Sequence, residues 1–430
     1  MKNWAGNIDL GTASVERPAS LEELRHVVAR GERIRALGAG HSFSGILATG
    51  GTLVRLDGLP PEIRIDAGSG TVTVGAGVRY AHLSAELHEA GYALANLASL
   101  PDITVAGAAA SATHGSGDGQ RCLAASVAGV ELVGPEGDLT TLRRDVDGDA
   151  FTGSVVSLGA LGVTARLTLE IEPSFEVAQS LRTAVSLDEL CARFDEAFGA
   201  AYSVSAFTLW RDDAVLWLKR RTDRPATELE LGALADGPLA PVPGDDPSHC
   251  TPQAGLPGPW HERLPHTLAG SAGDDGDELQ SEYFLPREAA PAAFAALQEL
   301  SGVLAPVLQV SEVRTVRGDD LWLSPAHERD SVTFHFTWTR DLARVRPVIE
   351  AVEERLAPLG ARPHWAKLTE MSSPTIRSLY RRAPDFTELR TKADPDGKFG
   401  NQFIDEVFPS GGPTGVPLPA HHRRSAHGKA

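Results

Sequence analysis

Residues 98–117 form a stretch in which nearly every side chain is small, and no other feature constrains the fold as much. The stretch reads Ala-Ser-Leu-Pro-Asp-Ile-Thr-Val-Ala-Gly-Ala-Ala-Ala-Ser-Ala-Thr-His-Gly-Ser-Gly. One interpretation is a tightly packed alanine-rich helix followed by a loop. The other is a backbone that lies against a flat or phosphorylated ligand, with hydroxyls supplied by Ser99, Thr104, Ser111 and Thr113. Because a core needs bulky side chains to fill it, we favour the ligand.

A glycine turn stands before a histidine earlier in the chain. Residues 34–37 are typical of a strand, and Gly38-Ala39-Gly40 and then His41 follow directly. Glycines let the backbone turn sharply and approach a ligand, and successive free N–H groups in such a turn form an anion site. A Gly-x-Gly turn alone is most often only a turn. The adjacent histidine makes this one a candidate binding segment.

Composition limits the classes of partner. The chain has 430 residues, enough for two domains, and its net charge of −17 argues against nucleic acids and anionic membranes. No apolar run approaches the roughly 18 residues of a membrane span, and the first residues lack the apolar core of a signal peptide. We therefore expect a cytoplasmic protein, and a monomer because no large apolar interface is indicated. Three widely separated cysteines are expected to be reduced thiols.

Capping signals and periodicity predict the elements. The capping box Ser20-Leu21-Glu22-Glu23 predicts a helix that begins at residue 21 and ends at Gly31. Further helices are predicted at residues 79–90, 187–198, 291–300 and 342–356. Strands are predicted at residues 33–37, 52–56, 63–66, 71–74, 127–133, 139–142, 163–171, 307–315 and 331–338. Residues 222–276 indicate long surface loops, and residues 409–430 a disordered tail.

Two predicted strands of the second half each have one polar face. Glu312 and Arg314 are two residues apart in one strand, so they point to the same side. In the other strand a polar face (Thr333, His335, Thr337) alternates with an aromatic face (Phe334, Phe336, Trp338). A sheet with one face in water is the commonest source of such alternation. A solvated face is usually rich in Lys, Glu and Asp, whereas these positions offer Thr, His and a single acid–base pair, so a polar binding face remains an alternative.

Other candidate residues are weaker. Lys367 is a lone cation beside aromatic residues, and a surface lysine whose stem lies on Trp365 is the plainer interpretation. His261 and His266 lie in a proline-rich segment without a third ligand at suitable spacing, so no metal site is predicted. The chain has no Gly-x-Ser-x-Gly elbow, no P-loop and no glycine fingerprint that opens a helix. A flat ligand is therefore not expected to bind in the Rossmann manner.

Several ordered motifs resemble the vanillyl-alcohol-oxidase family of FAD-linked oxidases. Three of them, at residues 38–42, 99–107 and 112–117, are similar to the FAD-binding domain of that family. Seven others are similar to the branch of the family that oxidises linear polyols. They lie at residues 3–7, 281–283, 286–288, 312–315, 335–338, 362–367 and 394–401. The resemblance covers residues 3–408.

The resemblance implies an α+β fold of two domains. Residues 1–173 would form a FAD-binding domain of two subdomains. Residues 174–375 would form an α+β cap, or substrate, domain with an antiparallel sheet. Residues 376–408 would return to the FAD-binding domain.

The resemblance also implies a cofactor, FAD, attached covalently through His41. The implied FAD contacts are Ala36, Leu37, Gly38, Ala39, Gly40, His41, Ser42, Ser99, Thr104, Gly107, Ser111, Ala112, Thr113, His114 and Val163. The implied catalytic residues are Lys367 as base, Arg314 as the group that stabilises the alkoxide, and His335. Substrate hydroxyls would contact Ser99, Glu312, Arg314, Thr337 and Lys367. Burial beside Arg314 is expected to lower the pKa of Lys367.

The implied activity is the transfer of a hydride from the terminal alcohol of a linear polyol, such as xylitol or sorbitol, to flavin N5. Dioxygen would reoxidise the flavin and give hydrogen peroxide, with the small side chain of Ala98 leaving a path for oxygen. The nearest alternative is an oxidase or dehydrogenase of aldonolactones from the same family. A flavoprotein that binds FAD and a polyol without turnover is disfavoured by the intact set of Glu312, Arg314 and Lys367.

Overall fold

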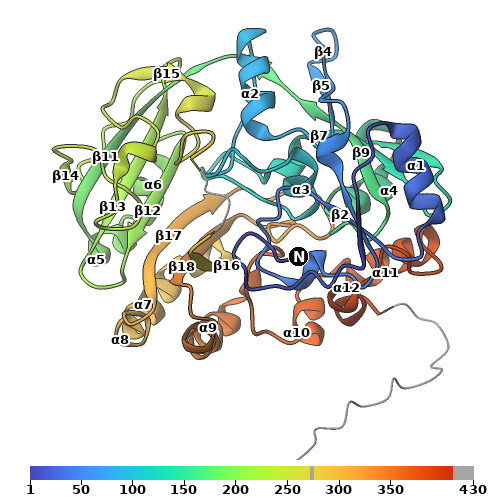
Figure 1. Ribbon diagram of the computed structural model, residues 1–430. Helices are drawn as coiled ribbons and strands as arrows, with labels where there is room; N and C mark the ends of the chain where they lie inside the picture. The colour runs from blue at the N-terminus through green and yellow to red at the C-terminus, as the bar shows by residue number, and fades with distance from the viewer. Residues whose placement is uncertain (272–275, 410–430) are drawn as a thin grey trace, which may run out of the picture.

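The computed structural model describes residues 1–271 and 276–409, and three larger sheets organise them (Figure 1). A three-stranded parallel sheet and a five-stranded antiparallel sheet belong to the first part of the chain, and a nine-stranded antiparallel sheet belongs to the second. The predicted α+β class is confirmed. None of the helices in the described ranges is long and apolar enough to cross a membrane. The predicted tail lies, from residue 410 onward, outside the described residues.

The glycine turn begins at the end of a strand in the parallel sheet. The sheet has the order β1-β3-β2, with β1 at Ser14–Glu16, β2 at Ile34–Leu37 and β3 at Thr52–Arg55. The helix α1 (Leu21–Arg30) joins β1 to β2, and the Ser20 hydroxyl accepts a hydrogen bond from the Glu23 N–H at 3.1 Å, as the capping box predicts. The end of β2 at Leu37 therefore fixes where the turn from Gly38 to His41 lies.

The five-stranded sheet packs behind the small-residue stretch. Its order is β4-β5-β9-β7-β8. The bounds are β4 Ile63–Asp66, β5 Thr71–Gly75, β9 Val163–Glu170, β7 Val127–Val133 and β8 Leu139–Arg143. The helices α2 (Tyr80–Glu89) and α4 (Arg144–Val155) belong to the same part of the chain. The short strands β6 (Tyr92–Ala93) and β10 (Glu172–Pro173) pair with each other.

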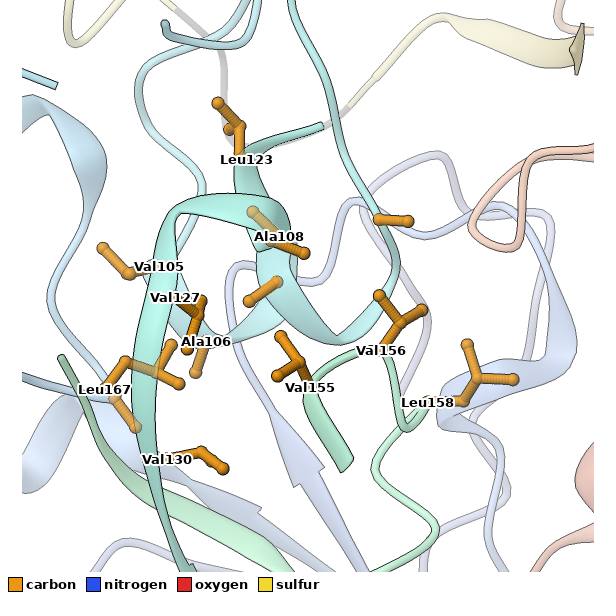
Figure 2. Close-up of a cluster of buried hydrophobic side chains, with 14 of the residues drawn as sticks. Val105, Ala106, Ala108, Leu123, Val127, Val130, Val155, Val156, Leu158 and Leu167 are labelled. Atoms are coloured by element: carbon orange, nitrogen blue, oxygen red, sulfur yellow. The ribbon is translucent and has the colours of Figure 1, made fainter. Parts of the chain in front are cut away.

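The small-residue stretch forms one short helix, α3 (Val105–Ala110). Figure 2 shows Ala106 and Ala108 of this helix among larger apolar side chains, including Val127, Val130 and Leu167 from two strands of the five-stranded sheet. Methyl side chains let the helix lie close to that sheet. The interpretation as a packed alanine-rich helix is therefore right for residues 105–110.

The nine-stranded sheet forms the other part of the molecule. Its order is β14-β11-β13-β12-β17-β18-β16-β19, and β15 pairs with β11. The bounds are β11 Glu176–Ser186, β12 Ser203–Thr208, β13 Asp213–Arg221, β14 Ala233–Leu234, β15 Pro257–Pro259, β16 Glu278–Pro286, β17 Leu308–Val316, β18 Ser331–Thr339 and β19 Arg362–Pro363. The helices α7 (Ala290–Glu299), α8 (Ser301–Leu304) and α9 (Leu342–Leu356) lie below β16–β18 in Figure 1. Phe334, Phe336 and Trp338 are buried in the same core as α7 and α9, as their shared face predicts.

Three expectations are corrected. The polar face of β18 is not in water, since every residue from Ser331 to Trp338 is buried. The reason is that the first part of the chain packs on this face of the sheet: His114 Nε2 lies 3.0 Å from the Glu282 carboxylate of β16, and Arg314 of β17 donates to the Ser99 hydroxyl at 3.3 Å. The predicted helix 187–198 is divided into α5 (Leu187–Ala192) and α6 (Phe194–Gly199), because Arg193 leaves helical geometry. Residues 222–276 are not all surface loops, because Thr251, Trp260 and His266 are buried.

The last described residues lie against the first part of the chain. The helices are α10 (Ser373–Ser378), α11 (Ala383–Ala393) and α12 (Gln402–Val407), and Figure 1 shows α11 and α12 near β2 and α1. The Arg35 guanidinium is buried and donates to four carbonyls. They belong to Ile46 (2.5 Å), Leu158 (2.5 Å), Gly159 (3.0 Å) and Phe399 (2.8 Å). One side chain thus joins β2 to three other segments, while the domain boundaries stay predictions.

We expect Arg35→Met to lower the free energy of unfolding by about 3 kcal/mol, because buried carbonyls lose their donor. Urea denaturation followed by circular dichroism measures the change. The matched control is Arg33→Met, whose exposed side chain should contribute about 0.5 kcal/mol or less. Equal stability of the two variants would contradict the central role of Arg35.

Candidate functional site

A cavity of about 830 Å³ is lined by the glycine turn, the small-residue stretch and the polar face of the nine-stranded sheet. Ligand pockets span roughly 300–1,000 Å³, so this one has room for a large ligand. The predicted residues that line it are Ala36, Gly38, Ala39, Gly40, His41, Ser42, Ser99, Thr104, Gly107, Ser111, Thr113, His114, Glu312, Arg314, His335, Thr337 and Lys367. Three predicted residues, Leu37, Ala112 and Val163, are buried and are not among its lining residues. Their neighbours on both sides line it instead.

In the first wall of the cavity, two glycines lie close to the side chain of Thr104. A Cβ added to Gly38 would lie 2.3 Å from the Thr104 hydroxyl, and one added to Gly107 would lie 2.8 Å from the same oxygen. Gly40 has a φ of +76°, which glycine adopts without strain. Hydroxyls of Ser42 and Thr104 face the same space. This combination of close backbone, hydroxyls and apolar surface fits the flat ring and diphosphate of FAD.

His41 provides an imidazole at the end of this wall. Its ring lies 4.8 Å from the ring of Trp4, measured between centroids. Burial, followed by the charges of Lys367 and Arg79, lowers the pKa of His41 to about 4. The imidazole is therefore neutral near pH 7 and has an unprotonated nitrogen, which covalent attachment to a flavin methyl group requires.

The second wall is a row of polar side chains set by strand register. Glu312 of β17 pairs with His335 of β18, and His335 pairs with Glu282 of β16. Residues directly opposite each other in a sheet point to the same face, so the three side chains form one line. Thr337 and Gln280 form the adjacent line in the same way. The strand pairing therefore brings together residues that are far apart in the sequence.

Arg314 joins the two walls. Its guanidinium donates to the Glu282 carboxylate at 2.5 Å and to the Ser99 hydroxyl at 3.3 Å, and its Nε lies 3.5 Å from the Glu312 carboxylate. Ser99 belongs to the small-residue stretch, whereas the two glutamates belong to the sheet. A guanidinium held by two carboxylates is rigid and stays charged, as a group that stabilises developing negative charge must.

Sequence reasoning missed Glu282 as a site residue. Its carboxylate accepts from Arg314 and from His114 Nε2 at 3.0 Å, and only 1% of the residue is exposed. Burial acts to raise the pKa of Glu282, but Arg314 and His114 outweigh it and hold that pKa well below the ordinary value. The available signal was an acid within the mostly apolar strand β16, where a lone buried carboxylate needs partners.

Lys367 lies inside the cavity and not on the surface. Its ammonium donates to the Gln280 side-chain oxygen and lies 5.1 Å from the centre of the Phe43 ring. Burial is the main cause that lowers the pKa of Lys367 to about 8, Arg314 lowers it further, and Glu282 opposes the shift. The expected direction is confirmed, although burial contributes more than Arg314. An amine with such a pKa can accept and release a proton near neutral pH.

His335 has a different protonation state. Burial, followed by the charge of Lys367, lowers the pKa of His335 to about 3. It is therefore a neutral hydrogen-bonding group in the row between the two glutamates. The His335 imidazole is therefore a weaker base than the Lys367 amine.

Three further histidines, His114, His266 and His364, lie at this wall. His266 Nε2 lies 2.7 Å from the Glu312 carboxylate, although sequence reasoning set this histidine aside. His114, Glu282 and His364 have possible metal-binding atoms within 4.8 Å of one another. Arg314 already supplies a positive charge to Glu282, so we assign no metal to this group.

Two family models match the chain. The model of the FAD binding domain matches residues 12–143, and that of D-arabinono-1,4-lactone oxidase matches residues 277–407. An alditol oxidase from a Streptomyces species is 48% identical over 411 residues, which cover 94% of this chain and 98% of that enzyme. The L-gulono-1,4-lactone dehydrogenase of Mycobacterium tuberculosis is 28% identical, and the L-gulonolactone oxidase of Bos taurus is 26% identical. These alignments cover 94% and 95% of this chain, respectively, and 98% of each relative.

Solved structures share the fold. A cholesterol oxidase variant from Brevibacterium sterolicum has a TM-score of 0.75 at 16% identity and covers 95% of this chain and 96% of its own. The glucooligosaccharide oxidase of Acremonium strictum has a TM-score of 0.70 at 12% identity and covers 95% and 93%. At these identities the likeness establishes the fold alone, and it confirms the fold class expected from the sequence.

We expect acid-precipitated protein to stay yellow and His41→Ala to release its flavin into the supernatant, because His41 would hold the flavin by a covalent bond. Absorbance of the pellet and supernatant measures the two fractions. His82→Ala, which removes a half-exposed histidine of α2, is the matched control and should keep a yellow pellet. A colourless pellet from the unsubstituted protein would contradict the bond to His41 while leaving FAD binding intact.

Proposed function

This chain belongs to the family of FAD-linked oxidases that includes alditol oxidase and the gulonolactone oxidoreductases, and on this premise we propose that it oxidises the terminal alcohol of a linear polyol. The products are the aldose and hydrogen peroxide, and xylitol and sorbitol represent the substrate class. The observation that carries the proposal is the convergence of Arg314, Glu312 and Lys367 on one cavity beside His41. A monomeric state and a cytoplasmic location remain predictions from the sequence.

The residues of the sheet supply position and charge for the reaction. FAD, held by the glycine turn and the small-residue stretch, would supply the acceptor for the C1 hydride and the path of two electrons to dioxygen. The neutral Lys367 amine accepts the proton of the C1 hydroxyl, since its pKa is close to neutral. Arg314 lies close to both glutamates and stabilises the negative charge that develops on the alcohol oxygen.

The line of polar groups favours an open-chain substrate. Ser99, Glu312 and Thr337 all line the cavity, and each can form a hydrogen bond with a hydroxyl of a polyol. A site built in this way rejects an analogue that lacks a hydroxyl, because a buried polar group is then left unpaired. Ala98 lines the same cavity with only a methyl group, which leaves space for dioxygen.

The alternative substrate is an aldonolactone. The match of residues 277–407 to the D-arabinono-1,4-lactone oxidase model and the likeness to the gulonolactone enzymes favour it. Identity to the lactone relatives is 26–28%, against 48% to alditol oxidase over a similar length, so we prefer the polyol.

The test is peroxide release by the purified protein in air. We expect peroxide with xylitol and sorbitol and little with gulono- or galactonolactone, measured by a peroxidase-coupled assay. Peroxide from the lactones alone would transfer the proposal to the aldonolactone class. If no substrate gives peroxide, reduction of an artificial electron acceptor distinguishes a dehydrogenase from a protein that only binds these compounds.

We expect the rate constant of flavin reduction by xylitol to rise with pH through about 8 and then level off, because Lys367 accepts a proton only as the neutral amine. Lys367→Met should lower the rate constant by about a hundredfold or more and remove this pH dependence, while the protein stays yellow. Stopped-flow absorbance measures both effects. Lys392→Met, which removes an exposed lysine of α11, is the control. An unchanged rise in Lys367→Met would assign the proton transfer to another group.

A further inference from the structure

A second lysine, Lys219, is buried behind the substrate wall. It lies on β13 with 1% of its surface exposed, and its Nζ is 5.9 Å from the centre of the Trp217 ring. A buried ammonium is costly unless all its N–H groups have partners. No step of the proposed reaction uses this lysine, so its presence calls for another explanation.

The ammonium of Lys219 has as many partners as it has N–H groups. It donates to the carbonyls of Leu264 at 2.5 Å and Pro265 at 3.0 Å, and its third partner is His266 Nδ1 at 2.9 Å. Two of these partners are backbone oxygens, which can only accept. Burial lowers the pKa of Lys219 to about 7, so the amine is charged below neutral pH; in that form it presents its third N–H to the imidazole, which must accept through Nδ1.

This contact decides which nitrogen of His266 carries the proton. If Nδ1 accepts from Lys219, the proton of the neutral ring is on Nε2. His266 Nε2 then donates to the Glu312 carboxylate at 2.7 Å, and the Ser205 hydroxyl lies farther away at 3.5 Å. Burial, followed by the charge of Lys219, lowers the pKa of His266 to about 4, so the ring is neutral. Phe207 and Trp217 pack edge-on against the ring and hold its plane.

The hydrogen bond from His266 helps to fix the Glu312 carboxylate. Burial acts to raise its pKa, but Arg314 and His266 outweigh burial and keep the carboxylate ionised. One oxygen is engaged by His266, and the other lies 3.5 Å from Arg314 Nε. A carboxylate fixed in this way accepts a substrate hydroxyl in one orientation only.

We propose that Lys219 is a positioning residue that locks His266 in the Nε2–H tautomer and thereby orients Glu312 to accept a hydroxyl of the polyol. The inference rests on the proposed function for the identity of the ligand. Without the ammonium, His266 is free to place its proton on Nδ1, and its unprotonated Nε2 then faces the Glu312 carboxylate. Two acceptors would oppose each other, and Glu312 would turn away from the substrate.

The first experiment reads the tautomer directly in the holoprotein. Nitrogen-15 NMR of protein labelled at histidine distinguishes Nε2–H from Nδ1–H, and His266→Gln identifies the signal of His266 by its loss. We expect Nε2–H in the unsubstituted protein and a mixture or Nδ1–H in Lys219→Met. An Nδ1–H tautomer in the unsubstituted protein would overturn the proposal, because Lys219 would then be a neutral amine that accepts from His266. This measurement needs no turnover, so it shows whether Lys219 fixes the His266 tautomer even if xylitol is not oxidised.

The second experiment is a double-mutant cycle on xylitol binding. Stopped-flow flavin reduction separates the apparent Kd from the limiting rate constant. We expect Lys219→Met to raise the Kd about tenfold and to change the limiting rate constant less. Glutamine has no tautomers of this kind, and its amide can donate to Glu312 directly. In the His266→Gln background, Lys219→Met should therefore change the Kd by less than about twofold.

Equal losses in the two backgrounds would show that Lys219 acts on the general packing and would overturn the proposal. Lys219→Leu, which also lacks a donor, replaces Lys219→Met in the cycle if the methionine variant does not fold. Lys392→Met is again the surface control and should leave both the Kd and the tautomer unchanged.

Discussion

The buried carboxylate of Glu282 is the group through which the two walls of the cavity are joined. Arg314 of the nine-stranded sheet and His114 of the small-residue stretch both donate to it, and they come from different parts of the chain. Taking a carboxylate out of water is costly, and the cost is offset only where several donors converge. The packing of the first part of the chain on the polar face of the sheet supplies one of these donors. The contact between the two walls therefore also stabilises the buried charge of Glu282.

The chemistry of Lys367 follows from the charges around that carboxylate. Burial and Arg314 favour the neutral amine, whereas Glu282, Glu278 and Glu312 favour the charged one. Burial and Arg314 alone would lower the pKa further, and the three glutamates alone would raise it. The opposing effects leave the pKa of Lys367 near 8, where the amine can take a proton and lose it again. His335 lies in the same field and cannot replace it, because its pKa is about 3.

The sequence predicted the features that depend on neighbouring residues, but it did not predict the contacts between strands that are far apart in the chain. The Ser20 cap, the helix α9 and the two faces of β18 are local patterns, and they are confirmed. The preference for a solvated polar face was wrong, because alternation in one strand says nothing about what packs on it. Glu282, Lys219 and His266 were missed as site residues for the same reason. Their roles depend on the register of β16 with β18 and on a loop that folds back under Ser99, and no local pattern encodes either contact.

The small-residue stretch shows why two competing interpretations were both correct. Its helix is packed in the core, yet Ala106, Gly107 and Ser111 also line the cavity. One side of the backbone contacts the five-stranded sheet through methyl groups, and the other side is left bare. At Gly38 and Gly107 even a Cβ would come within 3 Å of the Thr104 hydroxyl. Glycine at these two positions thus lets the turn after β2, the helix α3 and Thr104 pack against one another, and this packing sets the position of the wall that lines the cavity.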